Sequence, residues 1–85
     1  MYYIYVIKST KKDFLYVGQT EDLKRRFLEH NKKTELSTKF YAPFELVYYE
    51  AYKSKKDALI RENKLKHHGS SIGHLKRRIK NSLSL

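Results

Sequence analysis

Five side chains of this sequence have the chemistry and spacing of a site that processes phosphate. Tyr5 and Tyr16 stand 11 residues apart in two segments that are typical of neighbouring strands. Arg26 and His30 follow at the i, i+4 spacing of one helix face, and Glu62 comes much later. Arginine can clamp a phosphate, histidine or tyrosine can transfer a proton, and a carboxylate can hold a divalent cation. Together these residue types suggest phosphate chemistry on a nucleic acid.

Glu62 is the hardest of the five to explain by packing. Ala58, Leu59 and Leu65 lie three or four positions away, so Glu62 should point along the apolar face of its helix. A carboxylate there must be paired, protonated or bound to a cation. Two alternatives remain open: a salt bridge to an arginine of an earlier helix, or ligation of Mg²⁺ together with water and phosphate oxygens.

The other four residues also have ordinary structural roles open to them. Arg26 is either the partner of an acid, Glu62 included, or a bidentate phosphate clamp. His30 is either a packed histidine or a proton-transfer group. Tyr5 and Tyr16 are either packing residues or proton-handling groups. A free tyrosine pKa of about 10 must be lowered by nearby cations before tyrosine is an effective base.

Two short strands must position the tyrosines. Residues 2–7 are aromatic or β-branched, and residues 14–17 form a second run that Gly18 ends, so we expect an antiparallel hairpin. Alternation predicts one apolar face that faces the core, made of Ile4, Val6, Leu15 and Val17. The other face carries Tyr3, Tyr5, Tyr16 and Gly18. It is either half-buried surface or the floor of a site.

Helices must carry the remaining candidates. We expect Thr20 to cap a helix that ends near Asn31, with Glu21 and Asp22 in its first turn. Its inner stripe is Leu23, Phe27 and His30, with Arg26 beside it.

The residue pattern in the second half of the chain predicts one more strand and two more helices. Residues 44–52 form a strand that could bury either face, and Ser54 caps a helix that runs to about Lys66. A last helix spans about Ser71 to Ser82. The order ββα–β–αα predicts an α+β fold, a small three-stranded antiparallel sheet with packed helices, in a single domain of residues 1–85.

Composition narrows the class of protein. There is no cysteine, which excludes disulfides and thiolate metal sites. Lys8 interrupts the apolar run of residues 2–7, so this run does not resemble a signal peptide. Both features lead us to expect a cytoplasmic protein. No stretch approaches the roughly 20 apolar residues of a membrane span.

The charge is concentrated in the last third of the chain. Residues 1–52 carry 9 Lys and Arg against 7 Asp and Glu, whereas residues 53–85 carry 10 against 2. Such an excess favours a polyanionic partner, here a nucleic acid. We expect phosphate contacts from the last helix, through Lys76, Arg77, Arg78 and Lys80.

The strand motifs resemble those of the GIY-YIG nuclease family. Tyr3-Ile4-Tyr5 corresponds to the first motif, with tyrosine where the motif begins with glycine, and Tyr16-Val17-Gly18 corresponds to the second. The family's arginine, histidine and glutamate correspond to Arg26, His30 and Glu62. The resemblance covers about residues 2–80 and is greatest with the small, stand-alone bacterial members.

This resemblance implies a single-metal phosphodiester hydrolase that acts on DNA. Glu62 would hold Mg²⁺ or Mn²⁺. Tyr5 would be the general base on water, helped by His30. Arg26 would stabilise the phosphate, and Tyr16 would orient the phosphate or the water.

Two further residues take expected roles from the same resemblance. Gly18 would keep the strand end open to the substrate backbone. Homing members of the family carry another histidine after the first helix, where this chain offers Lys39 as a phosphate contact. Three functions remain open: a DNA endonuclease acting on branched or damaged structures (with RNA as the alternative substrate), a non-catalytic basic nucleic-acid-binding module, and a subunit that docks on a larger protein.

Overall fold

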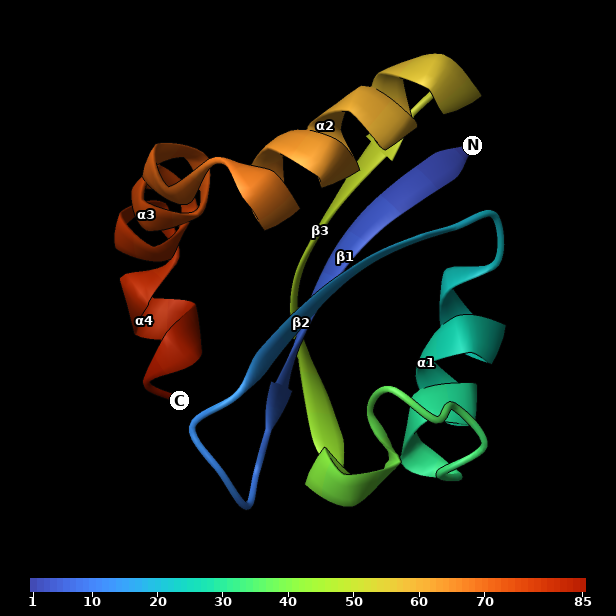
Figure 1. Ribbon diagram of the computed structural model, residues 1–85, viewed down its shortest axis with the longest axis vertical. Helices are drawn as coiled ribbons and strands as arrows, with labels where there is room; N and C mark the ends of the chain where they lie inside the picture. The colour runs from blue at the N-terminus through green and yellow to red at the C-terminus, as the bar shows by residue number, and fades with distance from the viewer.

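A three-stranded antiparallel sheet forms the centre of the protein. The computed structural model describes residues 1–85. Strands β1 (Tyr2–Ser9), β2 (Leu15–Thr20) and β3 (Phe44–Tyr52) pair in the order β2-β1-β3, so β1 lies in the middle (Figure 1). The expected α+β fold with its antiparallel hairpin is confirmed.

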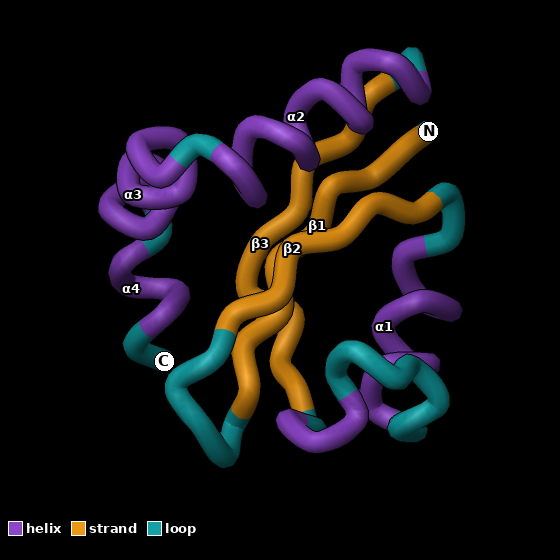
Figure 2. The backbone as a smooth tube through the Cα atoms, viewed as in Figure 1, coloured by secondary structure: helices purple, strands orange, loops and turns teal.

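Helices cover both faces of this sheet. Helix α1 (Leu23–Asn31) and the 3₁₀ turn η1 (Lys39–Tyr41) lie on one side. Helices α2 (Lys55–His67), α3 (Gly69–Arg78) and α4 (Lys80–Leu83) lie on the other, as Figures 1 and 2 show. Four consecutive residues of β1, Ile4 to Ile7, are therefore at most 1% exposed. None of the helices combines the length and the apolar character needed to cross a bilayer.

The alternation predicted for the hairpin holds, and each face packs into a core of its own. Ile4, Val6 and Val17 pack with residues of the C-terminal helices: Ala58, Leu65, Leu75 and Ile79. Tyr5 and Ile7 pack on the opposite face with Ala42 and Phe44, against Tyr16 and Phe27. The tyrosine face is thus covered by α1 and is no open surface.

A β-bulge explains why the buried face of β3 could not be predicted. The pairing of β1 with β3 shifts between Val6 and Ile7, which pair with Tyr48 and Leu46, so Val47 is the extra residue. An extra residue moves the side chains that follow it to the opposite face. Phe44 accordingly packs on the α1 side, whereas Tyr48 packs on the α2 side.

Two helix boundaries differ from the prediction. Asp22, and not Thr20, caps α1, because its carboxylate accepts the backbone N–H of Arg25 at 3.1 Å. Thr20 still belongs to β2, where it pairs with Tyr3. The predicted last helix is divided at Ile79, whose side chain is 8% exposed and stays in the core while the chain turns into α4.

Candidate active site

A chain of three buried polar side chains lies between β1 and α1. The hydroxyl of Tyr5 is 2.8 Å from Nε2 of His30, and Nδ1 of His30 is 2.7 Å from Oγ1 of Thr38. All three residues are at most 1% exposed. Tyr5 is on the central strand and His30 is in the last turn of the covering helix, so the packing of α1 on the sheet sets this geometry.

Burial keeps this chain uncharged near neutral pH. It raises the pKa of Tyr5 from 10.0 to about 12, although the nearby guanidinium of Arg26 acts in the opposite direction. Burial also lowers the pKa of His30 below 6.5, and the charge of Arg26 lowers it further. A neutral tyrosine therefore faces a neutral imidazole that can accept its proton.

Gly18 makes room for Tyr5. The two residues are direct partners in the β1–β2 pairing. A Cβ atom on Gly18 would lie 2.5 Å from Cζ and 2.8 Å from Cε1 of Tyr5, closer than real Cβ contacts. The motif glycine thus has a packing reason that sequence reasoning did not identify.

Arg26 forms salt bridges with two nearby carboxylates. Its guanidinium lies 3.1 Å from Glu29, one turn along α1, and 2.9 Å from Glu35, in the segment after the helix. Burial opposes the charge, but hydrogen bonds to Glu29, Tyr5 and Glu35 outweigh it and raise the pKa of Arg26. The alternative that Arg26 pairs with Glu62 is wrong.

Glu62 instead pairs with Lys66 on its own helix. The two side chains approach to 3.2 Å, and the Glu62 side chain is 21% exposed. The ammonium group of Lys66 also lies over the ring of Tyr16, 5.3 Å from the ring centroid. Lys66 thus contacts both Glu62 and Tyr16 and connects the carboxylate with the tyrosines. The expectation that Glu62 avoids water holds only in part.

Protein ligands for a metal ion are few in this structure. No group of three or more His, Cys, Asp or Glu residues is placed so that it could hold a metal ion. A single carboxylate with a cationic partner and partial access to solvent fits Mg²⁺ or Mn²⁺, because such an ion keeps several waters and shares substrate phosphate oxygens. Glu62 is the residue that could hold it.

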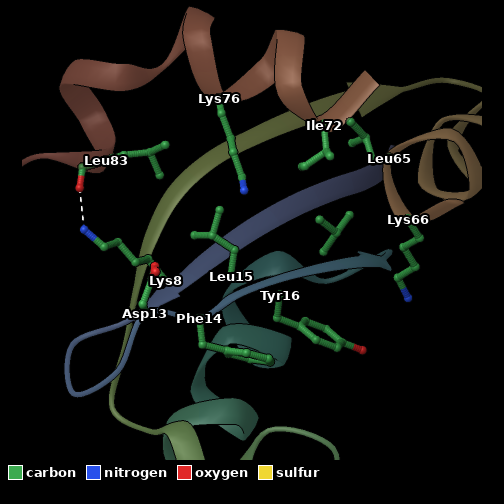
Figure 3. A pocket seen from close by; sticks show the side chains of 11 residues that line it. Lys8, Asp13, Phe14, Leu15, Tyr16, Leu65, Lys66, Ile72, Lys76 and Leu83 are labelled. Atoms are coloured by element: carbon green, nitrogen blue, oxygen red, sulfur yellow. Dashed lines mark hydrogen bonds between the residues drawn. The ribbon is translucent and has the colours of Figure 1, made fainter. Parts of the chain in front are cut away.

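Tyr16 connects this cluster with a groove along the edge of the sheet. Its ring centroid lies 6.3 Å from that of Tyr5 and 5.1 Å from that of His30. The groove, of about 730 Å³, runs between β2 and the C-terminal helices, and its sides carry Lys8, Lys66 and Lys76 (Figure 3). Its apolar floor is formed by Leu15, Val17, Leu65, Ile72 and Leu83.

The basic residues expected to bind phosphate have different surroundings. Lys76 points from α3 into the groove (Figure 3). Arg78 lines a separate cavity with Arg61 and His74, and Arg77 lies 2.6 Å from His74. Lys80 is exposed on α4, and Lys39, at the start of η1, lies over the ring of Phe40 at 5.1 Å.

Sequence reasoning missed three polar contributors. Glu35 and Thr38 fall in a stretch, residues 32–42, that is polar and irregular and gives no periodic signal. Glu50 accepts hydrogen bonds from Tyr48 and Tyr52 and a bidentate pair from Arg61 at 2.9 to 3.2 Å. The alternation Tyr48-Glu50-Tyr52 was a signal that these three side chains share a face.

Comparisons with known proteins agree with the motifs. A family model described as the GIY-YIG catalytic domain matches residues 1–77. UPF0213 proteins of Staphylococcus saprophyticus and Staphylococcus epidermidis are each 38% identical over 66 residues, which cover 76% of this chain and 79% of the relative. A UPF0213 protein of Streptococcus pyogenes is 41% identical over 61 residues, 71% of this chain and 65% of the relative. No solved structure gave a significant match. The chain therefore belongs to the GIY-YIG family, whose catalytic domain is that of a nuclease.

Proposed function

We propose that the protein is a metal-dependent endonuclease that hydrolyses phosphodiester bonds in DNA. One observation carries this proposal: the Tyr5 hydroxyl is hydrogen-bonded to Nε2 of His30 at 2.8 Å, and the positive charge of Arg26 acts on both groups, so a proton acceptor and a phosphate-binding cation lie close to one oxygen. Packing alone needs no such convergence.

The first step of the proposed reaction is a proton relay. Tyr5 releases its proton to Nε2 of His30 while its oxygen takes a proton from the attacking water. Tyrosine is then restored and the imidazole becomes charged. With a pKa of about 12, Tyr5 holds its proton at neutral pH, so it can act as a base only through such a relay.

Arg26 stabilises the negative charge of the phosphate in this proposal. A guanidinium forms two parallel hydrogen bonds to phosphate oxygens as readily as to a carboxylate. Because Glu29 and Glu35 occupy Arg26 in the free protein, the substrate must displace at least one of them. Tyr16, half-buried beside Tyr5 and His30, orients the phosphate or the water.

Glu62 would hold Mg²⁺ or Mn²⁺ close to Tyr16. The ion, when bound, would polarise the phosphodiester and offset the charge that develops on it. Lys66, which pairs with Glu62 in the free protein, would turn toward the substrate strand.

The substrate strand follows the groove in this proposal. Its lysines suit the sugar–phosphate backbone and its apolar floor suits bases, so Lys76 contacts the strand near Tyr16. Arg77, Arg78, Lys80 and Lys39 provide further contacts away from the reacting phosphate, and Gly18 keeps the strand end open to the backbone. We propose DNA over RNA, branched or damaged DNA in particular, a cytoplasmic location, and one domain that spans the chain.

The decisive experiment is a cleavage assay on single-stranded, duplex, flap and four-way DNA with Mg²⁺, Mn²⁺ or EDTA. Tyr5→Phe should cut the rate by on the order of 10²- to 10⁴-fold with little change in affinity, as expected for loss of a general base. The control Tyr49→Phe removes a hydroxyl from a tyrosine that is 53% exposed, and it should leave the rate unchanged. Absence of metal-dependent cleavage on every substrate would refute the proposal.

A second candidate is a non-catalytic basic nucleic-acid-binding module. The observation in its favour is that Tyr5 and His30 are at most 1% exposed, so water must gain access before they can react. In that case the protein would bind DNA with strong salt dependence, and Tyr5→Phe would be indistinguishable from wild type in every binding and cleavage assay.

A further inference from the structure

Thr38 ends the segment between α1 and η1 with a fully buried hydroxyl. The residues before it, 32–37, are exposed or half-buried, whereas Thr38 is 0% exposed. Its backbone is held at both sides: its N–H donates to the carbonyl of Glu35 at 3.2 Å, and its carbonyl accepts from Tyr41 at 2.9 Å. This backbone arrangement directs Oγ1 to Nδ1 of His30, 2.7 Å away.

The surroundings of Tyr5 indicate which nitrogen of His30 carries the proton. The Arg26 guanidinium is donor-only and its charge acts on the Tyr5 hydroxyl, so toward Arg26 the Tyr5 oxygen can only accept. The hydrogen of the buried Tyr5 hydroxyl then has Nε2 of His30 as its acceptor. The relay proposed above needs an unprotonated Nε2, so the hydrogen of the neutral imidazole sits on Nδ1, where Thr38 Oγ1 is within hydrogen-bond distance to accept it.

We propose that Thr38 is a positioning residue: its hydroxyl accepts the Nδ1 hydrogen of His30 and so holds Nε2 ready to accept the proton of Tyr5. Neither the family match nor the resemblance of the motifs assigns this role to Thr38. Its catalytic consequence rests on the proposed nuclease function.

This tautomer matters because only an unprotonated Nε2 can accept the proton of Tyr5. As water loses a proton to the Tyr5 oxygen, the Tyr5 O–H bond breaks and an N–H bond forms at Nε2. The hydroxide oxygen bonds to phosphorus, the bond from phosphorus to the leaving oxygen breaks, and that oxygen takes a proton from solvent. His30 then carries hydrogens on both nitrogens, and the Nδ1 hydrogen keeps its acceptor on Thr38. With the hydrogen on Nε2 at the start, the imidazole would donate to Tyr5 and could accept nothing from it.

Valine separates the role of the hydroxyl from that of packing. Thr38→Val keeps the shape of the side chain but removes the acceptor, which leaves the buried Nδ1–H without a partner. That loss favours the other tautomer, with the hydrogen on Nε2. Thr38→Ser keeps the acceptor and should restore the wild-type state. Thr34→Val makes the same change at an exposed hydroxyl of the same segment.

The test is nitrogen-15 NMR of the imidazole groups, with the signals of His30 identified among the four histidines by their loss in His30→Gln. Wild type, Thr38→Ser and Thr34→Val should show a protonated Nδ1 and a bare Nε2, and Thr38→Val should shift toward a protonated Nε2. The rate constant kcat should fall by on the order of 10-fold in Thr38→Val, with KM unchanged and recovery in Thr38→Ser.

The wild-type spectrum tests the proposal even if Thr38→Val fails to fold. A protonated Nε2 in wild type, or a tautomer that Thr38→Val does not change, would overturn the role of Thr38. The failure of the nuclease proposal looks different: no variant would cleave DNA, while the tautomer would still depend on residue 38.

Discussion

The guanidinium of Arg26 lies 2.9 Å from the carboxylate of Glu35, nine residues further along the chain. This pair occupies the cation that we propose for the phosphate. Glu35 is one-third exposed and sits in an irregular segment, so a substrate can displace it at small cost.

Glu35→Gln should strengthen DNA binding. Removing the carboxylate frees Arg26 for phosphate, and we expect a 2- to 5-fold gain in affinity, the size of a half-exposed ion pair. Fluorescence anisotropy at one fixed salt concentration would measure it. Glu45→Gln, an exposed change of the same charge, is the control. An equal gain in both variants would show that only net charge matters.

Gly18→Ala should destabilise the protein and displace Tyr5. The added methyl would overlap the Tyr5 ring, and we expect a loss of roughly 1–3 kcal/mol in the free energy of unfolding. Urea denaturation would measure it. Gly73→Ala is a matched control, because nothing lies within 4 Å of its Cβ position and it is helical, so stability should hold or rise. Equal stability of both variants would contradict this account of the motif glycine.

Glu62→Gln should abolish metal-dependent cleavage and leave DNA binding nearly intact. The amide keeps the shape but is a poor ligand for Mg²⁺, and the lost pair with Lys66 is half-exposed and worth only about 0–1 kcal/mol. Cleavage, affinity and melting temperature would be measured together, with Asp57→Asn on the same helix as control. If Glu62→Gln cleaved DNA as fast as wild type, Glu62 would not be a ligand of the metal ion.

Lys76→Ala should weaken DNA binding more than Arg77→Ala. Both remove one positive charge from α3, but only Lys76 lines the groove beside Tyr16. The slope of affinity against salt should drop by about one in Lys76→Ala. Equal losses in the two variants would mean that the whole of α3 binds the backbone without reference to the groove.

Acid stability should depend on Glu50. Burial raises the pKa of this carboxyl, but hydrogen bonds from Arg61, Tyr48 and Tyr52 outweigh it, so the pKa is lowered in the folded protein. A carboxyl whose pKa is lowered by folding stabilises the fold fully at pH values above its pKa in the unfolded chain. That stabilisation is lost as the pH falls through the pKa of the carboxyl in the folded protein. Glu50→Gln should therefore be less stable than wild type near neutral pH, with a smaller further loss in acid. Urea denaturation at both pH values would measure this, with Glu45→Gln as control.

Local patterns were enough to predict the elements and part of the site. Alternation predicted which residues of β1 and β2 share a face, and helical spacing put Arg26 and His30 together on α1. These features depend on neighbours two to four positions away, so periodicity reveals them. The motif residues Tyr5, Tyr16 and Gly18 lay within reach of the same reasoning.

Only the tertiary structure decided the partners. Arg26 pairs with Glu35, and His30 is hydrogen-bonded to Thr38, although Glu35 and Thr38 look like ordinary polar surface in the sequence. The path of the irregular segment after α1 brings these groups within 2.9 Å of their partners. A hydrogen bond between distant residues leaves no periodic trace in the sequence, because its geometry is set by the packing of whole elements and not by local conformation.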